Sequence, residues 1–145
     1  MSKISATITA LGAYVPEHIL SNAMLENMVD TNDEWITART GIKERRILKE
    51  NGKGTSYLAI NAAKDLIKKA ELDPSTIDLV IVATATPDMK AASTASFTAT
   101  AIGACNAFSF DMDSACSGFL FGMSTAASYI ESGRYKKILL IGADK

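Results

Sequence analysis

The stretch IDLVIVATAT, residues 77–86, limits what this chain can fold into more than any other part of the sequence. It is a continuous apolar run rich in β-branched residues, which is typical of a parallel strand buried on both faces. Two further strands are predicted by NAFSFDM (106–112) and KKILLIGA (136–143). Because parallel strands need crossover connections, usually helices, the sequence predicts an α/β fold with a mixed, mostly parallel sheet.

Two long helices are predicted beside these strands. Residues 55–70 carry apolar side chains at helical spacing with charged side chains opposite, as in a helix that covers a sheet. Residues 117–132 are apolar almost all round, and Gly133 follows as a stop signal. An all-round apolar pattern indicates a buried, central helix.

Shorter elements are predicted in the first third of the chain. Apolar residues alternate with Ser and Thr over residues 4–12, which favours a strand over a signal peptide. Residues 22–29 predict a short helix with Ser21 or Asn22 as its N-cap.

Another helical turn is predicted within DTNDEWITARTGIKERRIL, residues 30–48. Asp30 or Thr31 is suited to cap a turn that runs through Thr37, and Gly41 is suited to end it. The following IKERRIL leads back into extended chain.

The composition argues against several classes of function. Fifteen basic and sixteen acidic residues leave a net charge of −1, which gives no sign of a nucleic-acid or anionic-membrane partner. No run approaches the roughly 18 apolar residues of a membrane-spanning helix. We expect a cytoplasmic protein without a metal site, in which Cys105 and Cys116 are free thiols.

Cys116 lies in DMDSACSGFLFG, residues 111–122, among residues with almost no bulk. At a junction between a strand and a helix, backbone N–H groups and the helix dipole favour a thiolate and can hold an oxyanion, so Cys116 is a candidate nucleophile. A structural cysteine accounts for the same residues equally well. Cys105, which opens a strand, is predicted to be structural. The single histidine, His18, is expected to be an exposed turn residue, so this chain offers Cys116 no evident base.

Trp35 and Arg39 lie four residues apart, so a helix over residues 32–39 places both on one face. An indole and a guanidinium in that arrangement can sandwich a flat ring such as a purine. Spacing alone favours the plainer alternative, in which Trp35 packs on the core and Arg39 lies over it. The basic group Lys43, Arg45 and Arg46 either approaches phosphates or an acidic partner or is a solvated strand end.

Three motifs, in their order and spacing, resemble the β-ketoacyl-acyl-carrier-protein synthase III family. They are TNDEWITARTGIKERR near the amino terminus, TATPD after the buried strand, and DSACSGF after the next strand. The resemblance runs the whole chain and covers the amino-terminal half of the family's thiolase-like fold, in which two similar halves form a five-layered αβαβα body. It implies that residues 1–145 form one half-domain and that the carboxy-terminal half is absent from this chain.

The same resemblance implies an activity. A synthase III initiates fatty-acid synthesis by decarboxylative condensation of an acyl-CoA primer, acetyl-CoA or similar, with malonyl-acyl-carrier-protein. Cys116 is then the acylated residue, and Trp35 and Arg39 hold the adenine end of coenzyme A with Thr31 nearby. A homodimer with no permanently bound cofactor is implied. The assisting His and Asn belong to the missing half, so we expect this fragment alone to be inactive.

The chain departs from the family pattern at two places. Where the family often has Phe-Pro-Ser after TATPD, this chain has Ala91, Ala92 and Ser93. The aromatic that commonly reaches into the partner subunit's acyl pocket is then missing at Ala91, which leaves primer choice open. Asp113 stands three residues before Cys116, where its carboxylate would oppose a thiolate if it faced the sulfur.

Two alternatives to synthase III remain from the sequence. One is another thiolase-like condensing enzyme, such as a 3-hydroxy-3-methylglutaryl-CoA synthase or a long-chain acyl-condensing relative. The other is a non-catalytic α/β binding module in which Cys116 is structural.

Overall fold

The computed structural model describes residues 4–145, which divide into two compact units. Unit 1 contains residues 4–14 and 53–145, and unit 2 contains residues 15–52.

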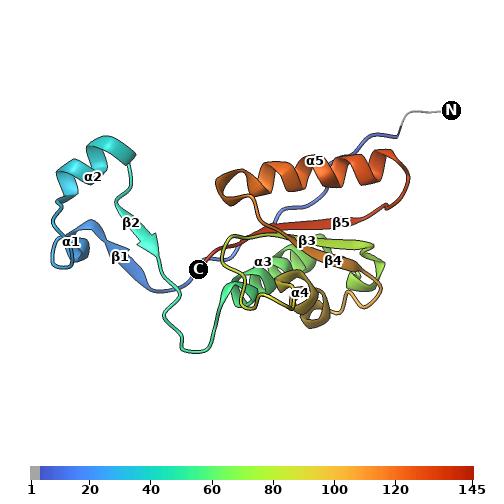
Figure 1. Ribbon diagram of the computed structural model, residues 1–145, viewed down its shortest axis with the longest axis horizontal. Coiled ribbons are helices and arrows are strands. Elements are labelled where there is room, and N and C mark those ends of the chain that lie inside the picture. The colour runs from blue at the N-terminus through green and yellow to red at the C-terminus, as the bar shows by residue number, and fades with distance from the viewer. Residues whose placement is uncertain (1–3) are drawn as a thin grey trace. The chain divides into compact units, whose positions relative to one another are not determined.

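Unit 1 is built in three layers (Figure 1). Its parallel sheet has the strand order β4-β3-β5. Two helices cover one face of the sheet and one helix covers the other. The strands are β3 (Leu79–Ala83), β4 (Phe108–Met112) and β5 (Ile138–Gly142). The helices α3 (Thr55–Ala70) and α4 (Thr94–Ile102) lie on one face of the sheet, and α5 (Gly118–Glu131) lies on the other. The three predicted strands and the positions of the two predicted long helices are confirmed, with β3 shorter than the apolar run. The second of these helices was expected to be buried all round, but Gly118 and Gly122 are the buried residues of α5.

The central strand β3 is buried over its whole length. It lies between two neighbours in register, with Leu79 opposite Phe108 and Ile138 at one end, and Ala83 opposite Met112 and Gly142 at the other. The carboxyl ends of all three strands therefore meet at one edge, which is where α/β proteins place their functional loops.

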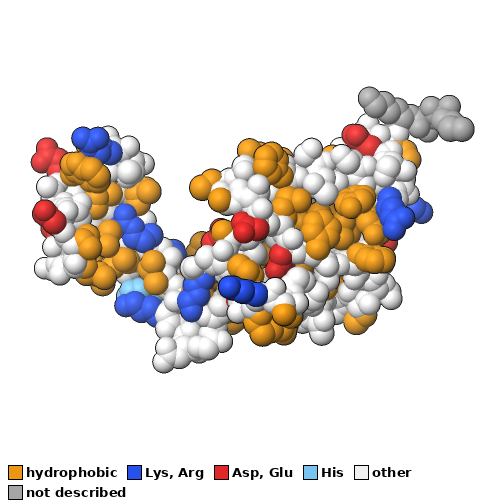
Figure 2. All heavy atoms as spheres, in the orientation of Figure 1, with side chains coloured by type: hydrophobic (Ala, Val, Ile, Leu, Met, Phe, Trp, Pro, Cys, Tyr) orange, Lys and Arg blue, Asp and Glu red, His pale blue; other side chains and the backbone are white. Residues whose placement is uncertain are grey.

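Glycines bring α5 directly onto the sheet. A Cβ on Gly122 would lie 2.5 Å from Leu140 Cδ1 of β5, and a Cβ on Gly118 would lie 3.4 Å from Ala83 Cβ of β3. Phe119 lies against Gly142 at the end of β5, since a Cβ on Gly142 would come within 3.1 Å of its ring. Phe119, Leu120 and Phe121 at the start of α5 are nevertheless 46%, 64% and 54% exposed. Figure 2 shows some apolar side chains at the start of α5 and a larger group over the sheet of the same unit.

Helix α4 was not predicted from the sequence. Ser93 caps it by accepting a hydrogen bond from the Ser96 N–H, and Ala95, Ala99 and Ile102 form its buried side. The segment TASFTATAI contains no charged residue and three β-branched threonines, so it lacks both the polar face and the helix propensity that identify α3.

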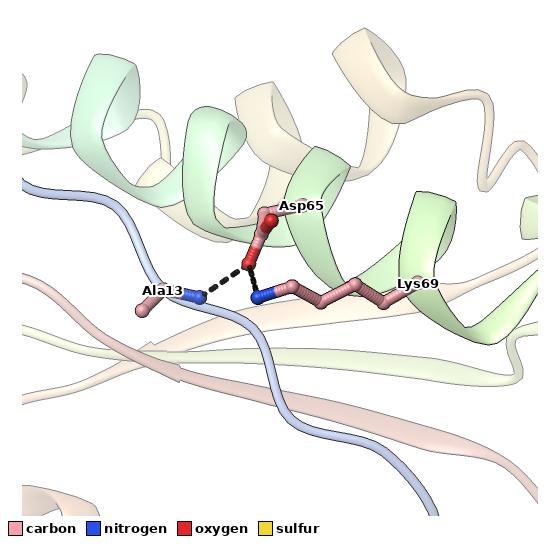
Figure 3. A network of polar contacts seen from close by, with 3 residues as sticks. All are labelled: Ala13, Asp65 and Lys69. Carbon is pink, nitrogen blue, oxygen red and sulfur yellow. Dashed lines mark hydrogen bonds and ion pairs between the residues drawn. The ribbon is translucent and has the colours of Figure 1, made fainter.

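The strand predicted over residues 4–12 is wrong, because the segment makes no ladder in either sheet. It runs instead past α3, and a Cβ on Gly12 would meet the Leu66 backbone nitrogen at 2.5 Å. The Ala13 N–H donates to Asp65 Oδ2 at 2.9 Å, and Lys69 Nζ lies 2.6 Å from the same oxygen (Figure 3). The Lys69 hydrogen bond and the Ala13 hydrogen bond lower the pKa of Asp65. Alternation alone does not make a strand, which also needs a neighbouring backbone to pair with.

Unit 2 consists of a two-stranded antiparallel ribbon and two short helices. Its elements are β1 (Ile19–Ser21), α1 (Asn22–Leu25), α2 (Asp33–Thr40) and β2 (Glu44–Arg46). Ser21 caps α1 as predicted, although the helix stops well before residue 29.

The helix α2 ends as predicted at Gly41, whose φ of 71° is in the left-handed region. The predicted cap, Asp30 or Thr31, is wrong. The cap is Asn32, whose Oδ1 accepts the Trp35 N–H at 2.7 Å. Because α2 begins at Asp33, residue 32 is the one whose side chain reaches the first-turn N–H groups.

Candidate functional site

Cys116 lies at the strand edge of unit 1, in a 3₁₀ turn over Ala115–Ser117 that leads from β4 into α5. Its thiol is free and exposed. Ala115 before it has a φ of 44°, a left-handed conformation that costs a non-glycine residue about 1–2 kcal/mol. Such strain concentrates at functional sites, where the surrounding structure holds a side chain in a particular direction.

The turn around Cys116 uses several of its own N–H groups. The Ser117 N–H donates to the Ser114 carbonyl at 3.1 Å, and the Gly118 N–H donates to the Ala115 carbonyl. The Ser117 hydroxyl also donates to the Ser114 carbonyl, at 2.8 Å. These bonds make the turn rigid, and they commit two of the N–H groups that the sequence suggested for an oxyanion.

The loops that follow β3 and β5 are tied together at the same edge. Asp144 Oδ1 accepts hydrogen bonds from the Thr84 hydroxyl at 3.0 Å, the Ala85 N–H at 2.8 Å and the Thr86 hydroxyl at 3.2 Å. Ala91 is exposed on the loop between β3 and α4. Ala91 and Cys116 therefore lie on the loops after two adjacent parallel strands.

The structure also gives the exposure of three titratable residues, Asp113, Cys105 and His18. Asp113 is exposed. Cys105 is also exposed, so the prediction that it is structural is not supported by burial. His18 was expected to be exposed but is partly buried, and its Nε2 has no hydrogen-bond partner among the described residues.

Trp35 and Arg39 are together on α2 in unit 2. The Arg39 Cζ atom lies 5.0 Å from the centroid of the Trp35 ring, and 54% of Trp35 is exposed, so it does not pack on the core. Ile36 is the buried residue of this helix. The guanidinium thus lies over the indole as the plainer alternative expected, while the indole itself stays accessible.

Thr31 lies beside this pair. A hollow of about 220 Å³ is lined by Asp30, Thr31, Asn32 and Trp35. Trp35, which the resemblance implies holds an adenine together with Arg39, therefore contacts Arg39 and shares this hollow with Thr31, the residue expected nearby.

The basic group of unit 2 is divided. Arg45 is partly buried and its Nη1 donates to Asn22 Oδ1 at 2.7 Å, while Arg46 Nη1 donates to the Pro16 carbonyl at 3.1 Å. Lys43 is exposed. Sequence reasoning treated Asn22 only as a possible cap and missed its place in this network.

Two other kinds of functional feature are absent from the described part of the chain. No group of three or more His, Cys, Asp or Glu side chains among residues 4–145 is arranged to hold a metal ion. No helix within that range combines the length and apolar content needed to cross a membrane.

Comparison with known proteins identifies relatives along the whole chain. Residues 110–145 match the 3-oxoacyl-[acyl-carrier-protein] synthase III family. A β-ketoacyl-[acyl-carrier-protein] synthase III from Bacteroides thetaiotaomicron is 58% identical over 145 residues, which is all of this chain and 43% of the relative. A relative with the same enzyme name from Porphyromonas gingivalis is 54% identical over the same shares. The chain thus spans less than half the length of these relatives.

Solved structures show the same likeness. The synthase III from Aquifex aeolicus superposes with a TM-score of 0.89 at 46% identity, over 94% of this chain and 44% of that one. The enzyme from Thermus thermophilus gives a TM-score of 0.90 at 41% identity, over 96% and 43%. From sequence and fold together, this chain belongs to the β-ketoacyl-[acyl-carrier-protein] synthase III family, with a thiolase-like α/β fold.

Proposed function

We propose that this chain is the amino-terminal half of an acyltransferase, a β-ketoacyl-acyl-carrier-protein synthase III. Its substrates are an acyl-CoA primer and malonyl-acyl-carrier-protein, and its nucleophile is Cys116. The observation that carries the proposal is an exposed thiol behind a strained residue, at the start of a helix that glycines hold against the sheet. The high identity to relatives that bear this enzyme name supports it.

The proposed reaction has two steps at one sulfur. The Cys116 thiolate attacks the thioester carbonyl of the acyl-CoA, the bond from that carbonyl to the CoA sulfur breaks, and CoA leaves as its thiol after taking a proton. Malonyl-acyl-carrier-protein then loses carbon dioxide, and the resulting carbanion attacks the acyl group on Cys116. The carbon–sulfur bond to Cys116 breaks, which yields β-ketoacyl-acyl-carrier-protein and restores the Cys116 thiolate.

The nucleotide end of the primer is assigned to unit 2. Trp35 offers an accessible indole, Arg39 offers a guanidinium in cation–π contact with it, and Thr31 lines the adjoining hollow. Aromatic faces and guanidinium planes both stack on purines. This arrangement supports the binding of the adenine of coenzyme A at the exposed side of α2.

The exposed face of α5 supports a larger assembly. Phe119, Leu120 and Phe121 are exposed at the start of α5, and large apolar surfaces of this kind are normally covered in the working protein. We assign their cover to the carboxy-terminal half and expect the whole enzyme to be a cytoplasmic homodimer. It needs no permanently bound cofactor, and neither nucleic acid nor a membrane is a partner.

Acylation by acetyl-CoA tests the proposal. The full-length protein is incubated with acetyl-CoA, digested at mildly acidic pH and analysed by peptide mass spectrometry. We expect one acetyl group on Cys116, which neutral hydroxylamine removes as it removes other thioesters. Cys105 is a matched control, because it is a second exposed free thiol in the same unit.

The controls separate an enzyme from a binding module. Cys116→Ser abolishes the thioester and product formation, whereas Cys105→Ser leaves both unchanged. A folded full-length protein with an unmodified Cys116, or with equal acetylation of both cysteines, would contradict the proposal and favour a non-catalytic α/β module.

A further inference from the structure

We infer that Asn22 is a positioning residue for the nucleotide-binding face of α2. Its buried amide holds α2 in the orientation in which Trp35 and Arg39 bind coenzyme A. The inference rests on the proposed function. It adds to the nucleotide site a residue whose side-chain hydrogen bonds involve neither Trp35 nor Arg39.

Asn22 is the best-connected polar side chain of unit 2. Only 1% of it is exposed, and its side chain joins three elements. Its Nδ2 group donates to Asp33 Oδ1 and to the Ile42 carbonyl, both at 2.7 Å, with Thr37 Oγ1 at 3.4 Å. Its Oδ1 accepts from Arg45 Nη1 at 2.7 Å. The amide thus links the start of α1, the first turn of α2 and the strand β2, and we call this set of hydrogen bonds the Asn22 network.

The two ends of the amide face opposite charges. The NH₂ end points to the Asp33 carboxylate, and the carbonyl end points to the Arg45 guanidinium. A neutral amide is the side chain that donates and accepts at once in this way. An aspartate at position 22 would keep the bond to Arg45 but would set a second carboxylate against Asp33, which is repulsive in a buried site.

Helix α2 depends on such contacts for its orientation. It is eight residues long, too short to be stable alone, and Ile36 is its buried residue. Asp33 and Thr37 of α2 are part of the Asn22 network, and the Thr37 hydroxyl also donates to Asp33 Oδ1 at 3.2 Å. Trp35 and Arg39 lie on the same two turns of α2, so a change in the Asn22 network moves both side chains together.

The expected consequence is on substrate affinity. If loss of the Asn22 network leaves α2 in its binding orientation for only a fraction of the time, the apparent dissociation constant for acyl-CoA rises by the inverse of that fraction. Chemistry at Cys116 in the saturated enzyme does not change. A residue that merely stabilised the fold would instead reduce the amount of active enzyme, which lowers kcat and leaves KM as it was.

The experiment measures kcat and KM for acetyl-CoA in the full-length enzyme with Asn22→Asp. We expect KM to rise about tenfold, the effect of about 1.4 kcal/mol, with kcat within about twofold of the parent. Adding Asp33→Asn reverses the hydrogen bond, because the new amide at 33 donates to the new carboxylate at 22. The double variant should recover a large part of the lost affinity, as expected for two groups in one network. If Asn22→Asp does not fold, Asn22→Ser has the same expected KM, since its hydroxyl is too short to reach both charges.

Asn27→Asp is the matched control. Asn27 is an exposed asparagine of the same unit, with its amide donating to the Ala23 carbonyl, and its replacement should leave KM unchanged. Trp35→Ala is measured alongside. Suppose that Trp35→Ala raises KM while Asn22→Asp leaves KM unchanged or lowers only kcat. That result overturns the inference and leaves the proposed function standing. An unchanged KM in Trp35→Ala overturns the proposed nucleotide site and the inference with it.

Discussion

The Asp111 carboxylate accepts the backbone N–H of Thr94 at 2.7 Å, and its other oxygen accepts the Ala95 N–H at the same distance. This fork joins β4 to the first turn of α4. Asp111 lies near the end of the strand that leads to Cys116, and Thr94 follows the loop that carries Ala91. One carboxylate therefore fixes two segments of the candidate site and satisfies two N–H groups at a helix end, where a negative charge is favourable.

Asp111→Ala is expected to lower the free energy of unfolding by about 2–3 kcal/mol. The reason is that it leaves two partly buried N–H groups of α4 without acceptors. Asp111→Asn should cost roughly half as much, because an amide keeps one acceptor oxygen. Urea unfolding checks both values. The control is Asp113→Asn, an exposed carboxylate two residues along, for which we expect a change within about 0.5 kcal/mol. Equal effects at both positions would disprove the role of the fork.

Asp78 should make the chain sensitive to acid. Hydrogen bonds from the Lys137 N–H and then the Lys136 N–H lower its pKa below the ordinary value of 3.8. A lowered pKa in the folded state contributes stability that is fully present above the ordinary value and is lost as pH falls through the lowered one. We therefore measure the urea midpoint of unfolding at about pH 5 and at about pH 2. The midpoint should drop less over this interval in Asp78→Asn than in the parent. Some pH dependence should remain, because the pKa of Asp65 and that of Asp73 are also lowered. Parallel pH profiles in the two proteins would rule this out.

Trp35→Ala should weaken the binding of CoA esters to the full-length enzyme by about 1–3 kcal/mol, the range for losing one aromatic stacking partner. Because Trp35 is mostly exposed, the free energy of unfolding should change by no more than about 0.5 kcal/mol. Isothermal titration with acetyl-CoA and urea unfolding measure the two quantities. Trp35→Phe keeps a ring and should retain much of the affinity. An unchanged affinity in Trp35→Ala would mean that the indole has no part in binding.

The central part of the fold could be predicted because its determinants are local. The apolar run over residues 77–86 contains β3, which is buried on both faces, and the amphipathic pattern over residues 55–70 matches α3. The segment 4–12 has a local pattern as clear as these, yet it forms no strand. Whether an extended segment pairs depends on its neighbours. Here Gly12 lies against Leu66 of α3, and the next residue, Ala13, bonds to Asp65, which is 52 residues away in sequence.

The candidate site was predictable to the extent that chemistry follows residue type. A free cysteine between small residues and a Trp-Arg pair at helical spacing both identified exposed groups of the structure. The residues that hold these groups could not be found in this way. Asn22 reaches Arg45 across 23 residues and Asp111 reaches Thr94 across 17, and no short-range pattern records such bonds.

Ala91→Phe should narrow the choice of primer. Ala91 is exposed on its loop, at the place where the family often has an aromatic. In the proposed dimer an alanine there would leave volume for a longer or branched acyl group. We therefore expect the parent enzyme to use branched or medium acyl-CoA primers at rates comparable with acetyl-CoA, and Ala91→Phe to shift preference towards acetyl-CoA. The shift is limited to about 1–3 kcal/mol, the selectivity that one methylene contributes in an apolar pocket. A primer series measured as kcat/KM on both forms checks this. Met89→Phe adds an aromatic at another exposed position of the same loop and should leave the series unchanged. Strong acetyl-CoA preference in the parent, unaltered by Ala91→Phe, would show that Ala91 does not line the acyl pocket.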